Sequence, residues 1–153
     1  MKKVTIILFI IALSSSAALA GDTAWGARLG LTDSGALSQF HFGGHAVVSH
    51  LSPNVTIVPS AELGLGDGTY FALNGDVLYE FTELASTPWS FYGGGGPMLG
   101  HYTNDGYDST DFALNLVGGA TYELEGRRNL FGELRLGLED APDVKLTFGI
   151  TFQ

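Results

Sequence analysis

The chain offers few residues whose types and spacing are those of a catalytic site. His101 and Thr103 stand two positions apart, so an imidazole could act as a base on a hydroxyl from the same side of a strand. In such sites a third group orients the base, and no glutamate with a matching position is evident near His101. We therefore predict that the chain has no catalytic residues and is not an enzyme.

Three further stretches could bind a metal ion or a phosphate, and none has the required spacing. His41 and His45 would be separated by roughly 13 Å on one strand, at ~3.3 Å per residue, which is too far for one shared ion. The acidic stretch 104–111 lacks the ligand spacing and the terminal glutamate of a calcium loop. The glycines at 93–96 are not followed by a helix, so they form no phosphate cradle. We expect hydrogen-bonded histidines, a solvated acidic loop, no metal site and no cofactor.

The segments that hold these residues alternate with period two, and one parity of each segment carries no charge. Successive residues of a strand point to opposite faces, so the pattern predicts strands with one apolar and one polar face. The eight expected strands cover residues 25–31, 40–48, 55–65, 71–81, 89–99, 112–124, 130–138 and 144–152. The polar parity holds Arg28, His41, His45, Glu62, Asp76, Glu80, Glu123, Glu133, Arg135 and Lys145. A bulge or bend is expected at 93–97, where four glycines precede a proline.

Residues 1–20 predict a secretory signal peptide that is not part of the fold. Two lysines precede an apolar stretch over 4–13, and a small-residue cleavage site ends at Ala20. The apolar stretch is too short for a spanning helix, which argues against a transmembrane anchor. Residues 21–153 then form one domain without cysteine, so neither disulfides nor thiolate metal sites hold it together. The formal net charge of −9 argues against nucleic acid as a partner.

Aromatic residues on the apolar parity gather at the two ends of the expected strands. If the exported chain forms an even-stranded barrel with both termini in the periplasm, the periplasmic end carries Trp25, Tyr79, Phe81, Trp89, Phe91, Tyr122 and Phe152. The outer end carries Phe40, Phe42, Phe71 and Phe112. Two aromatic belts with an aliphatic middle are typical of a membrane-spanning barrel. The alternative is a soluble periplasmic lipid-binding barrel with the apolar parity turned inward.

The polar parity would line the lumen of such a barrel. An eight-stranded barrel is just wide enough to be filled by side chains, so charges inside it need partners. The basic residues Arg28, Arg135 and Lys145 can be matched against the acidic residues Glu62, Asp76, Glu80, Glu123 and Glu133. Arg28 and Lys145 become neighbours only if the first and last strands meet and close the barrel. We therefore expect an ion-paired lumen that forms a plug rather than a pore.

The signal peptide, the eight alternating strands and the final segment 144–152 resemble small bacterial outer-membrane β-barrels. Similar groups are the transmembrane domain of outer-membrane protein A, outer-membrane protein X and the opacity-type porin family. The resemblance implies a monomer in the cell outer membrane, in contact with membrane lipid and lipopolysaccharide. It also implies insertion by the barrel-assembly machinery, which usually reads a terminal aromatic residue; here Gln153 follows Phe152. His101 and Thr103 loosely resemble the His-x-Ser pair of barrel enzymes that deacylate lipid A, with threonine in place of serine.

The observations together predict an all-β fold, an eight-stranded antiparallel up-and-down transmembrane β-barrel with a structural or surface-interaction role and no catalysis. The alternatives are a lipid-A-modifying barrel hydrolase and the soluble lipid-binding barrel. The outer loops would carry neither lysine nor arginine, but the acids Asp33, Asp67, Asp105, Asp108, Asp111, Glu139, Asp140 and Asp143. Because like charges repel, we expect contact with lipopolysaccharide, or with a host or envelope partner, to depend on Ca²⁺ or Mg²⁺ or on a basic partner surface.

Overall fold

The structure is a computed structural model that describes residues 23–33, 38–104, 106–138 and 144–153. The predicted signal peptide lies outside the described residues, as do Asp105, Glu139, Asp140 and Asp143 of the predicted outer loops. None of the described residues forms a helix that is long and apolar enough to cross a membrane. The regular structure in the described part of the chain consists of strands.

Nine strands within the described residues form one antiparallel sheet that closes on itself. They are β1 (Ala24–Asp33), β2 (Ser38–Val47), β3 (Ser49–Ser52), β4 (Val55–Gly66), β5 (Gly68–Glu80), β6 (Trp89–Asn104), β7 (Tyr107–Leu124), β8 (Arg128–Leu138) and β9 (Val144–Phe152). The short β3 follows β2 after Val48 and pairs with the same strand, β4. Since β2 and β3 share one position in the ring, the predicted eight-stranded antiparallel barrel is confirmed.

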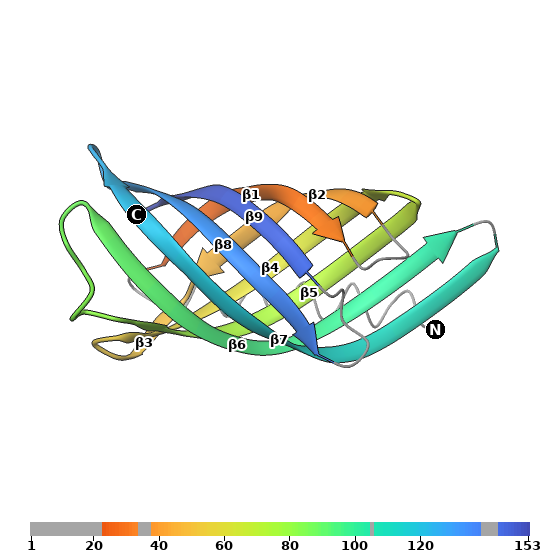
Figure 1. Ribbon diagram of the computed structural model, residues 1–153, viewed down its shortest axis with the longest axis horizontal. Coiled ribbons are helices and arrows are strands. Elements are labelled where there is room, and N and C mark those ends of the chain that lie inside the picture. The colour runs from red at the N-terminus through yellow and green to blue at the C-terminus, as the bar shows by residue number, and fades with distance from the viewer. Residues whose placement is uncertain (1–22, 34–37, 105, 139–143) are drawn as a thin grey trace.

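The pairing of β1 with β9 closes the barrel. This ladder is unbroken from the pair of Trp25 and Phe152 to the pair of Asp33 and Val144. Figure 1 shows the ring of tilted strands, with the β6–β7 hairpin projecting beyond the others at the end opposite to the C-terminus. We call the end reached by this hairpin the outer end and the opposite end the periplasmic end, which is the orientation expected of an exported barrel.

The β6–β7 hairpin is longer than the sequence pattern predicts. The pattern indicates a loop over 104–111, but β6 continues to Asn104 and residues 107–111 already belong to β7. Ladder pairs in this part, such as Thr103 with Asp108, carry polar side chains. The apolar alternation that marks the membrane-spanning wall therefore ends while the two strands go on.

The glycine-rich part of β6 passes through residues 93–97 without the expected bulge. Its register with β7 is unbroken along the whole strand. Its register with β5 is the same on both sides of a short gap, where Gly75 and Asp76 form no pair with Pro97 and Gly96. Because Pro97 has no N–H to donate, the irregularity is a gap in the ladder and not an extra residue.

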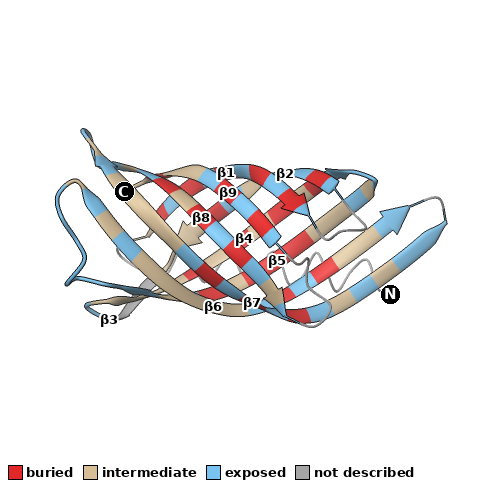
Figure 2. Cartoon of the chain, viewed as in Figure 1, coloured by how far each residue is buried: buried red, intermediate tan, exposed pale blue. Residues whose placement is uncertain are grey.

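The two faces of the barrel wall have opposite chemistry. Buried and exposed residues alternate along the whole of β1, and Figure 2 shows buried and exposed positions alternating along other strands of the barrel. The outward side chains are largely apolar, with Trp25 64% and Phe112 66% exposed, whereas most of the buried side chains are polar or charged. This arrangement confirms the predicted faces and contradicts the alternative of a soluble barrel with an apolar interior.

Aromatic side chains lie at both ends of the outward face, as predicted. At the periplasmic end the rings of Trp25 and Phe152 are 4.9 Å apart. At the outer end the rings of Phe40 and Phe42 are 6.3 Å apart, and Phe112 is exposed on β7. These two belts flank an aliphatic zone, which is the surface that a lipid bilayer covers in a transmembrane barrel.

Candidate functional site

Among the described residues, six charged side chains are buried in the lumen. Three are basic and three are acidic: Arg28 on β1, Glu62 on β4, Asp76 on β5, Glu133 and Arg135 on β8, and Lys145 on β9. Glu80 and Glu123, which the sequence also offered as partners of these basic residues, are exposed near the periplasmic ends of β5 and β7 and belong to none of the ion pairs found among the described residues. We call the six buried residues the lumen network; their formal charges balance without any contribution from the rim.

Arg135 joins two acids of the lumen network. Its Nη1 and Nη2 atoms donate to the two carboxylate oxygens of Asp76 over 3.1 and 2.8 Å, which makes a bidentate pair. Nη2 also donates to Oε1 of Glu133 over 2.9 Å. The guanidinium thus ties β8 to β5.

Arg28 and Lys145 share the carboxylate of Glu62. Nη1 of Arg28 lies 3.2 Å from Oε1 of Glu62, and Nζ of Lys145 donates to Oε2. Arg28 also lies 3.5 Å from Oε1 of Glu133, so Glu133 links the two halves of the network. The common partner of Arg28 and Lys145 confirms that closure of the barrel brings these two residues together.

The ion pairs between strands cross the lumen and do not follow the wall. They join β1 to β4, β1 to β8, β5 to β8 and β4 to β9, and no two of these strands are hydrogen-bonded neighbours. Buried charges are tolerated only where paired geometry and hydrogen bonds compensate for lost hydration. The pairs meet this condition and fill the middle of the barrel.

The two lumen histidines are hydrogen-bonded, as predicted. The Nδ1 and Nε2 atoms of His41 lie 2.9 and 3.0 Å from the hydroxyls of Thr32 and Thr147. Nε2 of His45 lies 2.8 Å from the hydroxyl of Thr151. Among the described residues, no group of three histidine or acidic side chains is arranged to hold a metal ion.

The outer half of the lumen contains a small apolar layer that sequence reasoning missed. Ala72, Met98 and Ala113 form a buried cluster that packs against Tyr70. The Tyr70 hydroxyl donates to the sulfur of Met98 over 3.5 Å. These residues occupy the inward parity. Because the lumen was predicted from its charged residues, these uncharged side chains were not identified.

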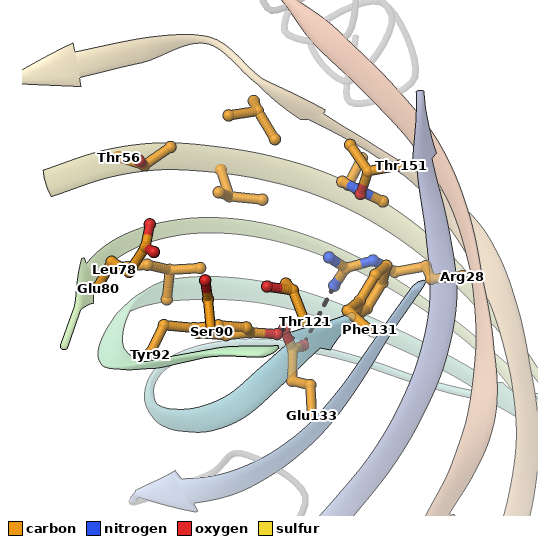
Figure 3. A pocket seen from close by; sticks show the side chains of 13 residues that line it. Arg28, Thr56, Leu78, Glu80, Ser90, Tyr92, Thr121, Phe131, Glu133 and Thr151 are labelled. Atoms are coloured by element: carbon orange, nitrogen blue, oxygen red, sulfur yellow. Dashed lines mark hydrogen bonds and ion pairs between the residues drawn. The ribbon is translucent and has the colours of Figure 1, made fainter. Parts of the chain in front are cut away.

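The periplasmic half of the lumen is hollow. Figure 3 shows the cavity, of about 130 Å³, with Arg28 and Glu133 ion-paired among its lining side chains. Its remaining lining residues are His45, Val47, Thr56, Val58, Leu78, Glu80, Ser90, Tyr92, Thr121, Phe131 and Thr151. Roughly four water molecules fit such a volume at ~30 Å³ each, and they can bind Nε of Arg28 and Nδ1 of His45, which have no protein partner. The lumen is therefore hollow on its periplasmic side and filled by the lumen network in its middle.

The outward face of the hairpin brings together the pair that was singled out in the sequence. Oγ1 of Thr103 lies 3.3 Å from Nε2 of His101, and Nδ1 of His101 lies 2.9 Å from Oγ1 of Thr110. Sequence reasoning missed Thr110, which the β6–β7 ladder pairs with His101. Within the described residues no carboxylate is hydrogen-bonded to His101, and both of its ring nitrogens lie near threonine hydroxyls.

Two of the outer acids are held by protein donors. A carboxylate oxygen of Asp67 accepts a hydrogen bond from the backbone N–H of Ser38 over 3.2 Å. The carboxylate of Asp111 accepts from the hydroxyl of Ser109 over 2.9 and 2.8 Å. Asp108 is exposed on the projecting hairpin, and Asp105 lies outside the described residues. These contacts fix the carboxylates of Asp67 and Asp111 at the rim.

The barrel matches solved membrane barrels in fold. No family model matches the sequence, and no curated protein matches it. The N-terminal β-barrel domain of Pseudomonas aeruginosa OprF aligns with a TM-score of 0.63 at 16% identity, over 85% of this chain and 96% of that one. Neisserial surface protein A aligns with a TM-score of 0.62 at 16% identity, over 85% and 94%. A structure from the de novo design of transmembrane β-barrels aligns with a TM-score of 0.59 at 16% identity, over 87% and 95%.

The similarity confirms the predicted resemblance at the level of the fold. The outward apolar surface, with an aromatic belt at each end, fits a wall that lipid surrounds, and the inward charges fit a lumen shielded from that lipid. The chain therefore has the fold of a small eight-stranded outer-membrane β-barrel.

Proposed function

We propose that this protein is a non-conducting, non-catalytic barrel with a structural or surface-interaction role in the outer membrane. The observation that supports the proposal best is the set of ion pairs that cross the lumen between strands that are not neighbours. With the apolar layer around Met98, these pairs obstruct the route from the periplasmic cavity to the outer end.

Single-channel recording of the refolded barrel in a planar bilayer tests this proposal. We expect little or no steady conductance from the intact protein. The double variant Asp76→Ala/Arg135→Ala removes one pair without changing the charge balance of the lumen, and it should open more often. Arg127→Ala, in an exposed turn, is the matched control and should stay silent. Large stable openings of the intact barrel would contradict the plug and make the protein a pore.

We propose further that His101 and Thr103 do not perform catalysis. The support is the hydrogen-bonding of the imidazole, whose second nitrogen meets the neutral hydroxyl of Thr110 where a hydrolase needs a carboxylate. Incubation with lipopolysaccharide, followed by mass spectrometry of free fatty acids, should detect no release. Release that disappears in the His101→Ala variant would establish the hydrolase alternative.

The outer surface is proposed to contact lipopolysaccharide through Ca²⁺ or Mg²⁺, or another partner through a basic surface. The support is charge: neither β6 nor β7 contains lysine or arginine, and Asp108 is exposed on their hairpin. A divalent cation can bridge carboxylates and lipid phosphates that would otherwise repel each other. We expect binding of the refolded barrel to lipopolysaccharide to weaken with a chelator, and to weaken equally in a variant with Asp105, Asp108 and Asp111 changed to Asn. If neither the chelator nor the substitutions weaken binding, the acidic residues serve only to keep the outer rim soluble.

We also expect a monomer that the barrel-assembly machinery inserts. The backbone N–H of Gln153 donates to the carbonyl of Arg127 over 2.9 Å, which holds the chain after Phe152 against the residue that precedes β8. Phe152→Ala removes the aromatic residue and should slow insertion into vesicles that contain the machinery. An unchanged insertion rate would contradict recognition of Phe152.

A further inference from the structure

A groove of about 250 Å³ lies along β5 and β6, beside the exposed ring of Phe112. Its lining consists of Leu73, Asn74, Gly75, Pro97, Met98, Leu99 and Phe112. The groove exists for two local reasons. The ladder between β5 and β6 has a gap at Pro97, and no atom lies within 4 Å of the position that a Cβ on Gly75 would take.

A hydrogen-bonded set of three residues adjoins the outer side of this groove. Thr103, His101 and Thr110 form this set, which we call the polar trio. His101 is the next residue on the same face of β6 after Leu99, and Thr110 holds the same relation to Phe112 on β7. Such neighbours are about 7 Å apart along a strand, so the trio and the groove form one continuous surface.

The polar trio lies at the level of the outer aromatic belt. Phe71 pairs with His101 in the ladder, and Phe112 lines the groove next to the trio. Aromatic belts mark the zone in which lipid headgroups meet hydrocarbon. The groove therefore lies at the depth of acyl chains, and the trio lies at the depth of the groups that link those chains to a headgroup.

The trio offers two hydroxyl groups and an imidazole, and it contains neither lysine nor arginine. Two threonine hydroxyls and one imidazole can donate to carbonyl oxygens or accept from hydroxyls. Asp108 is the ladder partner of Thr103, and β6 and β7 contain no lysine or arginine that could pair with a phosphate. The chemistry fits the acyl carbonyls and hydroxyls of an acylated sugar better than a phosphate.

We propose that the groove and the polar trio form a binding site for one acylated-sugar lipid of the outer leaflet. One acyl chain lies in the groove between Gly75, Pro97 and Phe112. The carbonyl and hydroxyl groups at the head of that chain are hydrogen-bonded to His101, Thr103 and Thr110. The site rests on the proposed position of the barrel in the outer membrane, but it needs neither a divalent cation nor the closed lumen.

Native mass spectrometry of the barrel from phospholipid nanodiscs that contain a small fraction of lipid A tests the proposal. Gly75→Leu fills the groove where the structure leaves space for a side chain, so the variant should fold. Gly118→Leu is the matched control, because Gly118 is an exposed glycine that, like Gly75, has no atom within 4 Å of its Cβ position. We expect wild type and Gly118→Leu to retain one lipid A molecule, and Gly75→Leu to retain about tenfold less.

Two further comparisons identify the lipid and the role of the trio. Dephosphorylated lipid A and lipid A should be retained to the same extent. Retention should also persist in the presence of a chelator. Both results would separate this site from the cation-bridged contact proposed for the acidic rim. Thr103→Val/Thr110→Val should lower retention while the thermal unfolding temperature stays close to that of the wild type. Equal retention by Gly75→Leu and wild type, or equal retention of phosphatidylethanolamine, would overturn the proposal whatever the conductance of the barrel.

Discussion

Leu134 and Arg135 are consecutive residues of β8 that face opposite surroundings. The side chain of Leu134 is 46% exposed on the outward face, whereas Arg135 is 1% exposed and bound to two acids. In a water-soluble protein the leucine would be buried and the arginine exposed. The inversion along this strand fits an outer face that lipid covers and an inner face on which other side chains replace water.

The two faces also differ in the interactions that stabilise their side chains. The outward face needs no specific partners, because an aliphatic side chain in lipid has no polar group to satisfy. The inward face depends on particular ion pairs, because each buried charge loses its hydration and needs a partner whose charge and hydrogen bonds offset that loss of free energy. Substitutions on the two faces should therefore fail for different reasons.

The largest effect is expected when one member of the lumen network is removed. Arg135→Ala leaves Asp76 and Glu133 buried without their shared partner, which should cost about 3–5 kcal/mol of unfolding free energy. Urea-induced unfolding in lipid vesicles measures the change. Arg127→Ala, in an exposed turn, should change the unfolding free energy by no more than about 0.5 kcal/mol. Equal losses in the two variants would mean that Arg135 is solvated and that the lumen is open.

A charge on the outward face should cost slightly less. Leu134→Arg or Leu116→Arg places a cation in the middle of the lipid-facing wall and should cost about 2–4 kcal/mol. Leu138→Arg, near the outer end of β8, should cost about 0–1 kcal/mol because the cost falls toward the interface. The same vesicle assay compares the three variants. Leu116→Arg with the stability of the wild type would show that the faces are reversed.

A smaller effect is expected for the neutral part of the lumen. His41→Ala leaves the hydroxyls of Thr32 and Thr147 without their shared partner and should cost about 1–3 kcal/mol. Urea-induced unfolding detects the change, and His101→Ala on the outward face is the comparison. A loss for His41→Ala no larger than that for His101→Ala would mean that the lumen hydrogen bonds do not support the barrel.

The architecture could be predicted because alternation is a local property of each strand. The parity that carries Leu134 and Leu116 has no charge, and this alone separates the two faces. The extent of β6 and β7 could not be predicted in the same way. From the outer aromatic belt onward both faces of the hairpin carry polar side chains, so Thr103 and Asp108 show no apolar alternation although they form a ladder pair.

The six members of the lumen network were all among the charges that the sequence placed in the lumen, but their pairing was not predicted. Arg28, Arg135 and Lys145 were matched against acids of the same parity, whereas the partner of each depends on how the strands are staggered around the closed barrel. That stagger places Glu80 and Glu123 at the rim and Asp76 opposite Arg135. The groove beside Gly75 was missed for a related reason, since it needs Pro97 to lie across from Gly75 on another strand.

The fold alone does not assign a role to the barrel. The OprF domain, Neisserial surface protein A and a designed transmembrane barrel share this architecture at 16% identity. A designed protein can therefore have the same fold as natural barrels of different sequence. The role of this chain must come from its own surfaces, which are the lumen network, the acidic rim and the groove below the polar trio.

A double-mutant cycle between Asp76 and Arg135 tests the lumen-crossing network most directly. Asp76→Ala, Arg135→Ala and the double variant are unfolded by urea in lipid vesicles, and the free energies are compared with that of the wild type. A pair that crosses the lumen from β5 to β8 predicts a double variant that is less destabilised than the sum of the single variants, by about 0.5–3 kcal/mol. Losses that simply add would contradict a direct contact between the two side chains, and with it the closed lumen.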